Sequence, residues 1–347
     1  MAQYRKGDFL MKKISFFTFS FPLMAAALCL TASLALEAVP FQESPSRYFS
    51  SEYTSSVYSA SRALPEASAQ DLSGSGEEVC RLSGGPLVPP DEISGIPQAR
   101  LQETSLLNLL HEVQIYYTGA QISAAPLLAE DSDLAGLEEG PVFESDLDRL
   151  YPSEDTLCVL EMSGEQLRQY MEWSAAYFNT YKNGDVTLSF SPDRDGSTYD
   201  LFAGIRYEIN LSKKPGRRIE SLTWPDGSEI RDSEAVTVAV SSSRAFSQLL
   251  TAGEIFPEGS SLPRLAKENA SSIRDLIQDY LVDVKGGSLE APSLTGNWRL
   301  TGIGWDEALH QEAAELINSG QLSLTDSENG TGRNISSLTV WDLNRIR

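Results

Sequence analysis

The fold is decided by residues 156–178, which read TLCVLEMSGEQLRQYMEWSAAYF. The first six of them, Thr156 to Glu161, are largely apolar and predict a strand. Ser163 then precedes Gln166 by three residues, the spacing at which the two side chains cap a helix start reciprocally. The helix continues with an apolar and aromatic face, which predicts packing in a core rather than a binding surface. That face comprises Leu167, Tyr170, Met171, Ser174, Tyr177 and Phe178.

Further strands and helices flank this strand–helix unit on both sides. Thr104 can cap a helix that Gly119 ends, and an extended run follows from Ile122 to Leu128. After the unit, alternating or β-branched residues predict strands at 205–211, 219–224 and 235–240, and helical spacing returns at 244–250 and 270–284. Strands mixed with helices of this length predict an α+β or α/β domain of about two hundred residues.

The composition excludes several classes of function. The 347 residues carry 27 Lys and Arg against 49 Asp and Glu, a net charge of −22, so a nucleic-acid polymer or an anionic membrane surface would repel the chain. Two histidines cannot build a His-rich metal centre, and three cysteines cannot form a cysteine-stapled scaffold or a four-thiolate zinc site. With 41% apolar residues, the chain can bury a substantial core.

The N-terminus has the pattern of a signal peptide over residues 1–35. Met11-Lys12-Lys13 forms a positive start, residues 14–30 are apolar apart from Ser and Thr, and Ser33-Leu34-Ala35 offers a small-x-small cleavage site. A single anchoring helix is the alternative, because the apolar run is about as long as a thin bilayer requires. The pattern therefore predicts an exported protein, which is extracellular, at the cell surface or periplasmic.

Residues 36–98 are predicted to be a Ser-rich, disordered linker. Eleven serines occur among the forty residues from Phe41 to Cys80 without a sustained helical or strand period, so ordering them would bury little surface. At the other end, residues 306–347 are expected to form a C-terminal helix and a polar tail. Cys80 and Cys158 can pair in an oxidising compartment or remain thiols, and their spacing does not decide between these states.

The sequence contains few short motifs that by themselves indicate catalysis or ligand binding. It lacks the Gly-Lys dipeptide of a phosphate-binding P-loop and the Gly-x-Ser-x-Gly elbow of a serine hydrolase. Asp306 and His310 stand four residues apart and could share a metal, but without a third ligand they are expected on a solvated helix surface. His111 is likewise expected on the surface of its helix. No cofactor and no metal site are predicted.

Short stretches in a fixed order point to a known family. They include LLNLL at 106–110, SAAP at 123–126, SGEQL at 163–167, PGRRI at 215–219 and GNWR at 296–299. With them, residues 101–305 resemble the C-terminal domain of the 5′-nucleotidase family, in its branch of bifunctional 2′,3′-cyclic-nucleotide 2′-phosphodiesterase/3′-nucleotidases. The resemblance implies an α+β domain over residues 99–305, built from a mixed sheet with packed helices and linked to nucleotide catabolism.

The resemblance also implies which part of the family's chemistry is present. In the family, an N-terminal metallophosphatase domain holds two metal ions and hydrolyses the substrate, whereas the C-terminal domain stacks the base between two aromatic rings. This sequence has no Asp-x-His motif and no Asn-His pair that would supply such metal ligands. We therefore expect a nucleotide-binding domain without the metallophosphatase domain, with no catalytic residue and no metal ligand in this chain.

The nucleoside site that the resemblance implies departs from the family. Ser153 stands where the first stacking ring belongs, and Asp155 stands where the family has asparagine. Ser243 takes the position of the second ring, directly before Arg244, which matches the family's pattern. The loss of both rings predicts a degenerate site, since stacking contributes about 1–3 kcal/mol per base. The alternative is a retained site, in which the loop slips and Tyr151 supplies a ring.

Three functions are compatible with these features. The first is an exported family member that is catalytically incompetent alone, a pseudoenzyme with a degenerate site for a nucleoside or nucleotide. The second is a substrate-binding subunit of a hydrolase that a separate metallophosphatase chain completes. The third is a cell-surface interaction module that reuses the fold.

Overall fold

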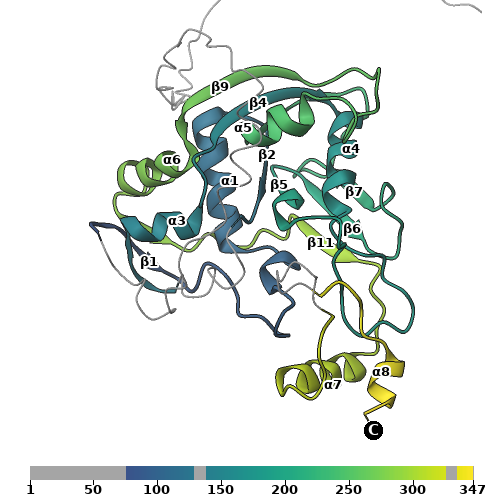
Figure 1. Cartoon of the computed structure of the whole chain (residues 1–347). Helices are drawn as coiled ribbons and strands as arrows, with labels where there is room; N and C mark the ends of the chain where they lie inside the picture. The colour runs from purple at the N-terminus through teal and green to yellow at the C-terminus, as the bar shows by residue number, and fades with distance from the viewer. Residues whose placement is uncertain (1–75, 129–137, 326–333, 347) are drawn as a thin grey trace, which may run out of the picture. The chain divides into compact units, whose positions relative to one another are not determined.

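A computed structural model describes residues 76–128, 138–325 and 334–346. The predicted signal peptide at 1–35 and the predicted linker up to residue 75 lie outside the described residues. All described residues belong to one compact unit of the chain. Mixed sheets with packed helices confirm the predicted α+β fold class (Figure 1).

A five-stranded mixed sheet with the order β5-β2-β8-β4-β9 forms the centre of the domain (Figure 1). Its strands are β2 (Ile122–Pro126), β4 (Thr156–Ser163), β5 (Asp200–Ala203), β8 (Ala235–Ser241) and β9 (Arg264–Ser272). β2 and β8 run parallel, whereas the other neighbours run antiparallel. The strands predicted at 156–161 and 235–240 are therefore direct neighbours in the sheet.

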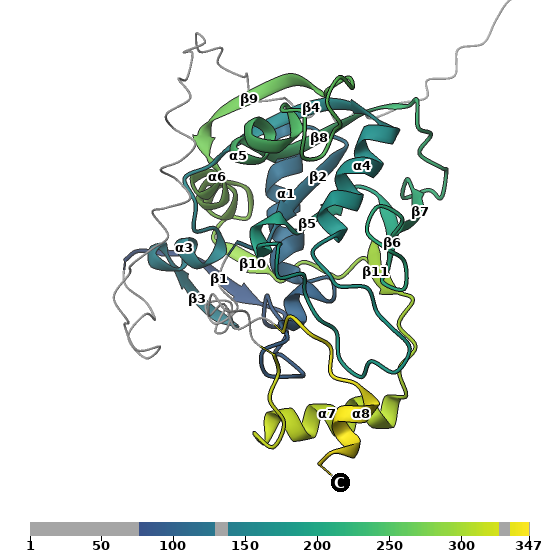
Figure 2. The same ribbon diagram turned by 45° about the vertical axis from the view of Figure 1, so that its right-hand side comes forward.

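Two three-stranded sheets lie beside the central one (Figure 2). The first has the order β10-β1-β3 and consists of β1 (Glu78–Ser83), β3 (Gly140–Phe143) and β10 (Ser288–Glu290). The second has the order β11-β6-β7 and consists of β6 (Arg206–Asn210), β7 (Ile219–Thr223) and β11 (Trp298–Thr301). In each of them, a strand from the end of the domain completes a sheet that begins much earlier in the chain.

Helices α1 (Ser105–Thr118) and α4 (Gly164–Ala175) pack against the central sheet. The others are α3 (Leu147–Leu150), α5 (Ser242–Arg244), α6 (Ile273–Asp279), α7 (Glu307–Asn318) and α8 (Val340–Asn344). Short 3-10 helices η1 (Gln98–Arg100), η2 (Glu144–Asp146) and η3 (Gly196–Thr198) and π-helical turns η4 (Ala245–Leu249) and η5 (Tyr280–Val284) complete the set. None of the helices in the described part of the chain is long and apolar enough to span a bilayer.

The predicted helix starts are confirmed at their capping residues. The Ser163 hydroxyl accepts a hydrogen bond from the Gln166 N–H at 3.2 Å, and the Gln166 Oε1 accepts one from the Ser163 N–H at 2.9 Å. Thr104 accepts from the Leu107 N–H at 3.1 Å, and Gly119 ends α1 in the left-handed region with φ 67°. These local hydrogen bonds fix the residues at which α4 and α1 begin. The start of each helix determines which of its faces is turned toward the sheet, and in both helices this is the apolar face.

The predicted aromatic residues are confirmed as core, although α4 ends at Ala175 and Tyr177 and Phe178 lie just beyond it. Tyr170 packs edge-on against Phe202, and Tyr177 stacks on Tyr199 with ring centroids 4.9 Å apart. The C-terminal end of this helix is closed by Arg218, which donates to the carbonyls of Ala175 at 2.6 Å and Phe178 at 2.8 Å. Burial lowers the pKa of Arg218 to about 10, partly offset by the nearby Glu172 carboxylate.

The prediction for His111 is wrong, because α1 is buried around most of its circumference. His111 is 3% exposed and its Nδ1 lies 2.8 Å from the Ser123 hydroxyl. Since Ser123 donates its one proton to Gln114 Oε1 at 2.8 Å, the His111 Nδ1–H is the donor in this pair. Burial lowers the pKa of His111 to about 3, so the ring is neutral at physiological pH.

The last part of the predicted linker, residues 76–98, is folded. Strand β1 pairs with β3 and β10, and Leu82 and Cys80 are buried in the core. The serine count does not reveal this, because the apolar residues of β1 come at the very end of the Ser-rich run. Cys80 and Cys158 are both buried free thiols, and burial raises their pKa values to about 11 and about 12.

The assignment of β1 to the fold can be tested within the strand. Leu82→Ala should lower the free energy of unfolding by about 2–5 kcal/mol, because it leaves a cavity under the sheet. Arg81→Ala is the matched control, since the exposed Arg81 side chain pairs only with Glu78 on the surface and should contribute less than about 1 kcal/mol. Urea unfolding of the full chain measures both. Equal, small effects would place residues 78–83 outside the cooperative unit.

Candidate nucleoside site

The candidate site lies where β4 begins and β8 ends. The two strands are antiparallel and pair Leu157 with Ser241, so the residues before Leu157 and those after Ser241 meet at one edge of the sheet. The loop of residues 151–155 therefore faces the turn at 241–244, although Asp155 and Ser242 are 87 positions apart in the sequence.

Asp155 holds the two segments together. Its Oδ1 accepts hydrogen bonds from the Ser242 hydroxyl at 2.5 Å and from the Ser243 N–H at 2.9 Å. Its own N–H donates to the Ser153 hydroxyl at 3.3 Å, and its carbonyl accepts from the Ile273 N–H at 2.7 Å. The structure thus brings Ser153, Asp155 and Ser243 together, as the matching to the family places them.

The two predicted ring positions carry no ring. Ser153 and Ser243 are both half-buried and both contact Asp155. Tyr151, the residue that a slipped loop would use, is 1% exposed and belongs to the hydrophobic core. Its N–H donates to the Leu147 carbonyl at 2.9 Å, as the helical turn α3 ends. The Tyr151 ring is therefore enclosed by the domain rather than presented at the sheet edge.

Sequence matching missed an exposed ring one helical turn further on. Phe246 follows Ser243 by three residues, in η4, and is 45% exposed. Ser243 belongs to α5 and Phe246 to the directly following η4, so Phe246 is the first aromatic residue after Ser243 along the chain. The sequence does show an aromatic residue three positions after Ser243. A position-by-position comparison with the family looks only at residue 243 and therefore does not find it.

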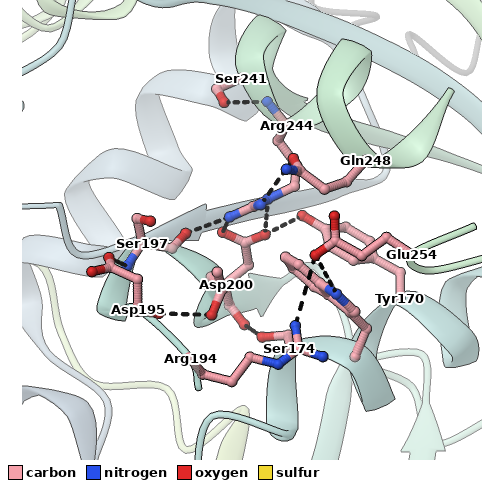
Figure 3. A network of polar contacts seen from close by, with 12 residues as sticks. Tyr170, Ser174, Arg194, Asp195, Ser197, Asp200, Ser241, Arg244, Gln248 and Glu254 are labelled. Carbon is pink, nitrogen blue, oxygen red and sulfur yellow. Dashed lines mark hydrogen bonds and ion pairs between the residues drawn. The ribbon is translucent and has the colours of Figure 1, made fainter. Parts of the chain in front are cut away.

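The side chain of Arg244 is directed into the domain (Figure 3). Its Nε donates to Asp200 Oδ2 at 2.6 Å and its Nη2 to Asp200 Oδ1 at 3.3 Å, and further bonds reach the Ser197 carbonyl and Gln248 Oε1. Both partners of this ion pair are buried. The guanidinium charge is therefore neutralised inside the protein, where it positions α5 rather than a ligand.

The carboxylate of Asp200 is shared with α4. Tyr170 donates its hydroxyl to Asp200 Oδ2 at 2.5 Å, and Ser174 donates to the Asp200 carbonyl at 2.6 Å. Burial, followed by the Asp200 charge, raises the pKa of Tyr170 well above its ordinary value, so the hydroxyl keeps its proton. The Asp200 side chain thus joins strand β5, helix α4 and the turn after β8.

The network continues to the surface through Trp173. The Arg244 and Arg194 guanidinium groups lie over the Trp173 ring at 4.7 Å and 5.1 Å, and the indole N–H donates to Glu254 at 3.2 Å. Arg194 also pairs with Glu254 at 3.9 Å (Figure 3). Two loops, which carry Arg194 and Glu254, are in this way fixed against α4.

Carboxylates predominate on the surface beside Asp155. Arg274 reaches this surface from α6 and pairs with Asp148 at 2.7 Å and with Glu154 at 3.6 Å. Its charge is shared between two acids, while Asp155 adds a third negative group. A ligand phosphate would therefore meet a net negative potential at this edge. Sequence reasoning did not single out Arg274, since only the fold brings α6 next to the loop.

Among residues 76–128, 138–325 and 334–346, no cluster of His, Cys, Asp and Glu side chains has the geometry to hold a metal ion. Asp306 instead caps α7 by accepting from the N–H groups of Ala308 and Leu309. His310 is half-buried, stacks on Trp305 at 4.0 Å and lies 2.7 Å from the Val186 carbonyl through its Nδ1. The pair predicted on a solvated surface therefore lies partly in a packed contact.

Comparison with known proteins shows which family this part of the chain resembles. Residues 89–248 match the sequence pattern of the family described as 5′-nucleotidase, C-terminal domain. These residues form a 5′-nucleotidase C-terminal domain. The chain is 28% identical over 178 residues to a 2′,3′-cyclic-nucleotide 2′-phosphodiesterase/3′-nucleotidase of Haemophilus influenzae, a match that covers 46% of this chain and 25% of that protein.

One of two solved structures compared with this chain shares its fold by TM-score. A candidate 5′-nucleotidase from Staphylococcus aureus, solved in complex with alpha-ketoglutarate, superimposes with a TM-score of 0.53 at 20% identity, over 65% of this chain and 41% of that one. An NAD nucleotidase of Haemophilus influenzae has a TM-score of 0.43 at 15% identity, over 65% of this chain and 38% of that one. This chain thus spans less than half the length of each of these proteins.

The role of Arg244 in the 5′-nucleotidase C-terminal domain can be measured against Arg194. Arg244→Met should lower the free energy of unfolding by about 3–5 kcal/mol, because it leaves the Asp200 carboxylate buried and unpaired. Arg194→Met is the matched control, since Arg194 lies over the same Trp173 ring but pairs with a half-exposed acid, and its loss should be below about 1 kcal/mol. Equal losses in denaturant titrations would show that the cation–π contacts, rather than the ion pair, fix this network.

Proposed function

We propose that this 5′-nucleotidase C-terminal domain is a weak nucleoside- or nucleotide-binding module that does not hydrolyse its ligand alone. The observation that carries the proposal is the convergence of Ser153 and Ser243 on Asp155. Ser153 and Ser243, which we match to the family's two stacking rings, both contact Asp155 at one edge of the sheet, and this supports a site that keeps its frame but carries hydroxyl groups in place of rings.

Weak binding follows from the side chains at this edge. A base that stacks on an aromatic ring gains about 1–3 kcal/mol, and serine offers no comparable face. The carboxylates of Asp148, Glu154 and Asp155 further disfavour a phosphate. Phe246 is the nearest exposed ring along the chain and could contact a base from one side. An uncharged nucleoside therefore suits the site better than a nucleotide.

The lack of hydrolysis rests on the available ligands. The whole sequence has two histidines, whereas the two-metal site of the family needs several metal ligands of the His, Asp and Asn type. His111 is enclosed in the core, and His310 uses Nδ1 at the Val186 carbonyl. The small number of ligands supports a pseudoenzyme, or a domain that acts with a separate protein that carries out the hydrolysis.

A second candidate function is that of a substrate-binding subunit. The match to the Haemophilus influenzae enzyme covers 25% of that protein, so three quarters of that enzyme lie outside the aligned region. A separate metallophosphatase chain could supply the hydrolytic step and receive the ligand at this domain. A neighbouring reading frame with metallophosphatase motifs would favour this function over a pseudoenzyme. A cell-surface interaction module remains the third candidate.

Export is part of the proposal. The pattern of residues 1–35 directs the chain out of the cytoplasm, to the periplasm, the cell surface or the medium. Extracellular nucleotides would then be the source of the ligand. Fractionation of the native host with an antibody against the domain tests this directly, and a purely cytoplasmic signal from a chain that keeps residues 1–35 would contradict it.

Restoring the two rings should strengthen nucleoside binding. The double variant Ser153→Tyr with Ser243→Tyr should bind adenosine at least about fivefold more tightly for each ring that stacks, because each contact contributes about 1–3 kcal/mol. Isothermal titration of the full chain measures the change. Ser319→Tyr, at the exposed end of α7, is the matched control for non-specific adsorption to an added tyrosine.

The same titrations identify a retained site. Micromolar binding by the wild-type chain that Phe246→Ala abolishes would show that a displaced ring already serves the base. Micromolar binding that Tyr151→Ala abolishes, with the fold intact by circular dichroism, would show that the loop moves and exposes that ring. Either result would contradict a degenerate site.

Hydrolysis is tested on the full chain by itself. With Mn²⁺, Mg²⁺, Co²⁺ or Zn²⁺ present, we expect no turnover of 2′,3′-cyclic AMP or 3′-AMP above a blank, because the chain offers too few ligands for a two-metal site. A mock purification from cells without the gene controls for host phosphatases. Metal-dependent turnover that is absent from the mock sample would contradict the proposal.

A further inference from the structure

A patch of exposed aromatic and apolar side chains lies where α1 packs against α6 and the following turn η5 (Figure 1). Tyr116, near the end of α1, is 49% exposed, and its ring centroid lies 5.0 Å from that of Tyr117 and 5.3 Å from that of Tyr280 in η5. The same turn exposes Val282 and Val284. Exposed apolar side chains that gather in one place, rather than singly, mark interaction sites. None of these residues belongs to the candidate nucleoside site.

Tyr280 shows how a cation is held in this patch. The Lys285 ammonium lies 5.3 Å from the centroid of the Tyr280 ring and 3.2 Å from the Glu112 carboxylate. The negative face of the ring attracts the ammonium, and the carboxylate compensates its charge. A tyrosine ring with a carboxylate beside it is therefore an arrangement that this protein already uses to bind a cation.

Tyr117 has the same combination of groups without a cation. Burial, followed by the negative charge of Asp279, raises the pKa of Tyr117 to about 12, and Asp283 contributes further, so both carboxylates lie near this side chain. The pKa of Asp279 is itself raised, first by burial and then by the charges of Asp283 and Asp275. Among residues 76–128, 138–325 and 334–346, no Lys, Arg or His forms an ion pair with Asp279 or Asp283.

The basic side chains of the neighbouring elements have other partners. Lys285 pairs with Glu112, and Arg274 pairs with two acids beside the nucleoside edge. Lys267 of β9 donates to the Thr118 carbonyl at 3.3 Å, at the end of α1. The three aspartates of α6 and η5 therefore leave a net negative charge beside the exposed rings. A partner that complements this surface is cationic and carries an apolar side chain.

We propose that this patch binds a basic segment of a partner protein, in which an arginine or lysine lies against Tyr117, beside Asp279 and Asp283, and a neighbouring apolar side chain covers Tyr116. Charge complementarity favours such a partner, and the exposed rings add contact area. A second copy of this chain is disfavoured, because it carries 27 Lys and Arg against 49 Asp and Glu. The patch is independent of the nucleoside edge, so it stands whether or not that edge binds a nucleoside.

The probe is a short, fluorescein-labelled peptide of alternating leucine and arginine. Fluorescence polarisation with the full chain, at about 0.15 M ionic strength to screen non-specific attraction, should show saturable binding. The same peptide with citrulline in place of arginine keeps its shape and loses its charge, and should bind at least about threefold more weakly. A peptide with serine in place of leucine should also bind more weakly, since it offers no apolar side chain to cover Tyr116.

Two double variants that remove the same charge locate the binding surface. Asp279→Asn with Asp283→Asn should weaken the leucine–arginine peptide about threefold to tenfold, the range expected for an exposed cation beside a ring and carboxylates. Glu307→Gln with Glu315→Gln, on α7 and outside the patch, is the matched control and should change the affinity by less than about twofold. Tyr116→Ser should weaken the leucine–arginine peptide more than the serine–arginine peptide, which separates the apolar contact from the charge.

Three results would overturn the proposal. They are an absence of saturable binding, equal binding of the arginine and citrulline peptides, and equal weakening by the two charge-matched double variants. The last result would show a general attraction of basic peptides to an acidic chain. Circular dichroism and urea unfolding of every variant should match the wild type, because the substituted side chains are exposed.

Discussion

The ion pair between Asp200 and Arg244 is the interaction on which the arrangement of the candidate site depends. Asp200 begins the edge strand β5, whereas Arg244 follows β8, and strand β2 lies between them in the sheet. Two buried charges are tolerated here because each has further partners: Tyr170 donates to the carboxylate, and the Ser197 carbonyl accepts from the guanidinium. The pair therefore joins the edge of the sheet, α4 and α5 in one rigid end of the domain.

The fixed position of Arg244 determines which polar groups lie at this edge of the sheet. Since the Arg244 side chain is held inside, the backbone of the preceding turn is fixed, and the Ser243 N–H and the Ser242 hydroxyl point to Asp155. The Asp200–Arg244 ion pair thus fixes the turn after β8, and the Asp155 carboxylate fixes the loop before β4 to that turn. A basic residue that sequence matching places in the site contributes by positioning, because its charge is already compensated.

Local signals in the sequence predicted much of the fold, and tertiary contacts account for what they missed. The Ser163–Gln166 capping box and the dense apolar run at 235–240 are complete within a few residues, so they could be recognised. Strand β9 could not, because its residues are mostly exposed at the edge of the sheet and show no alternation. In the site, matching placed Ser153, Asp155 and Ser243 together, whereas the direction of the Arg244 side chain depends on Asp200, forty-four residues earlier.

The aspartate at position 155 explains how the fold persists while the site changes. With serine at 242 and an unblocked N–H at 243, a carboxylate forms two charge-assisted hydrogen bonds, which are stronger than those of the neutral asparagine that the family carries there. The same charge lies where a nucleotide's phosphate would be repelled. If this edge binds a nucleotide as proposed, the carboxylate that tightens the junction between β4 and β8 would weaken the affinity for that anionic ligand, so the stability of the domain and its affinity for a nucleotide would be opposed at Asp155.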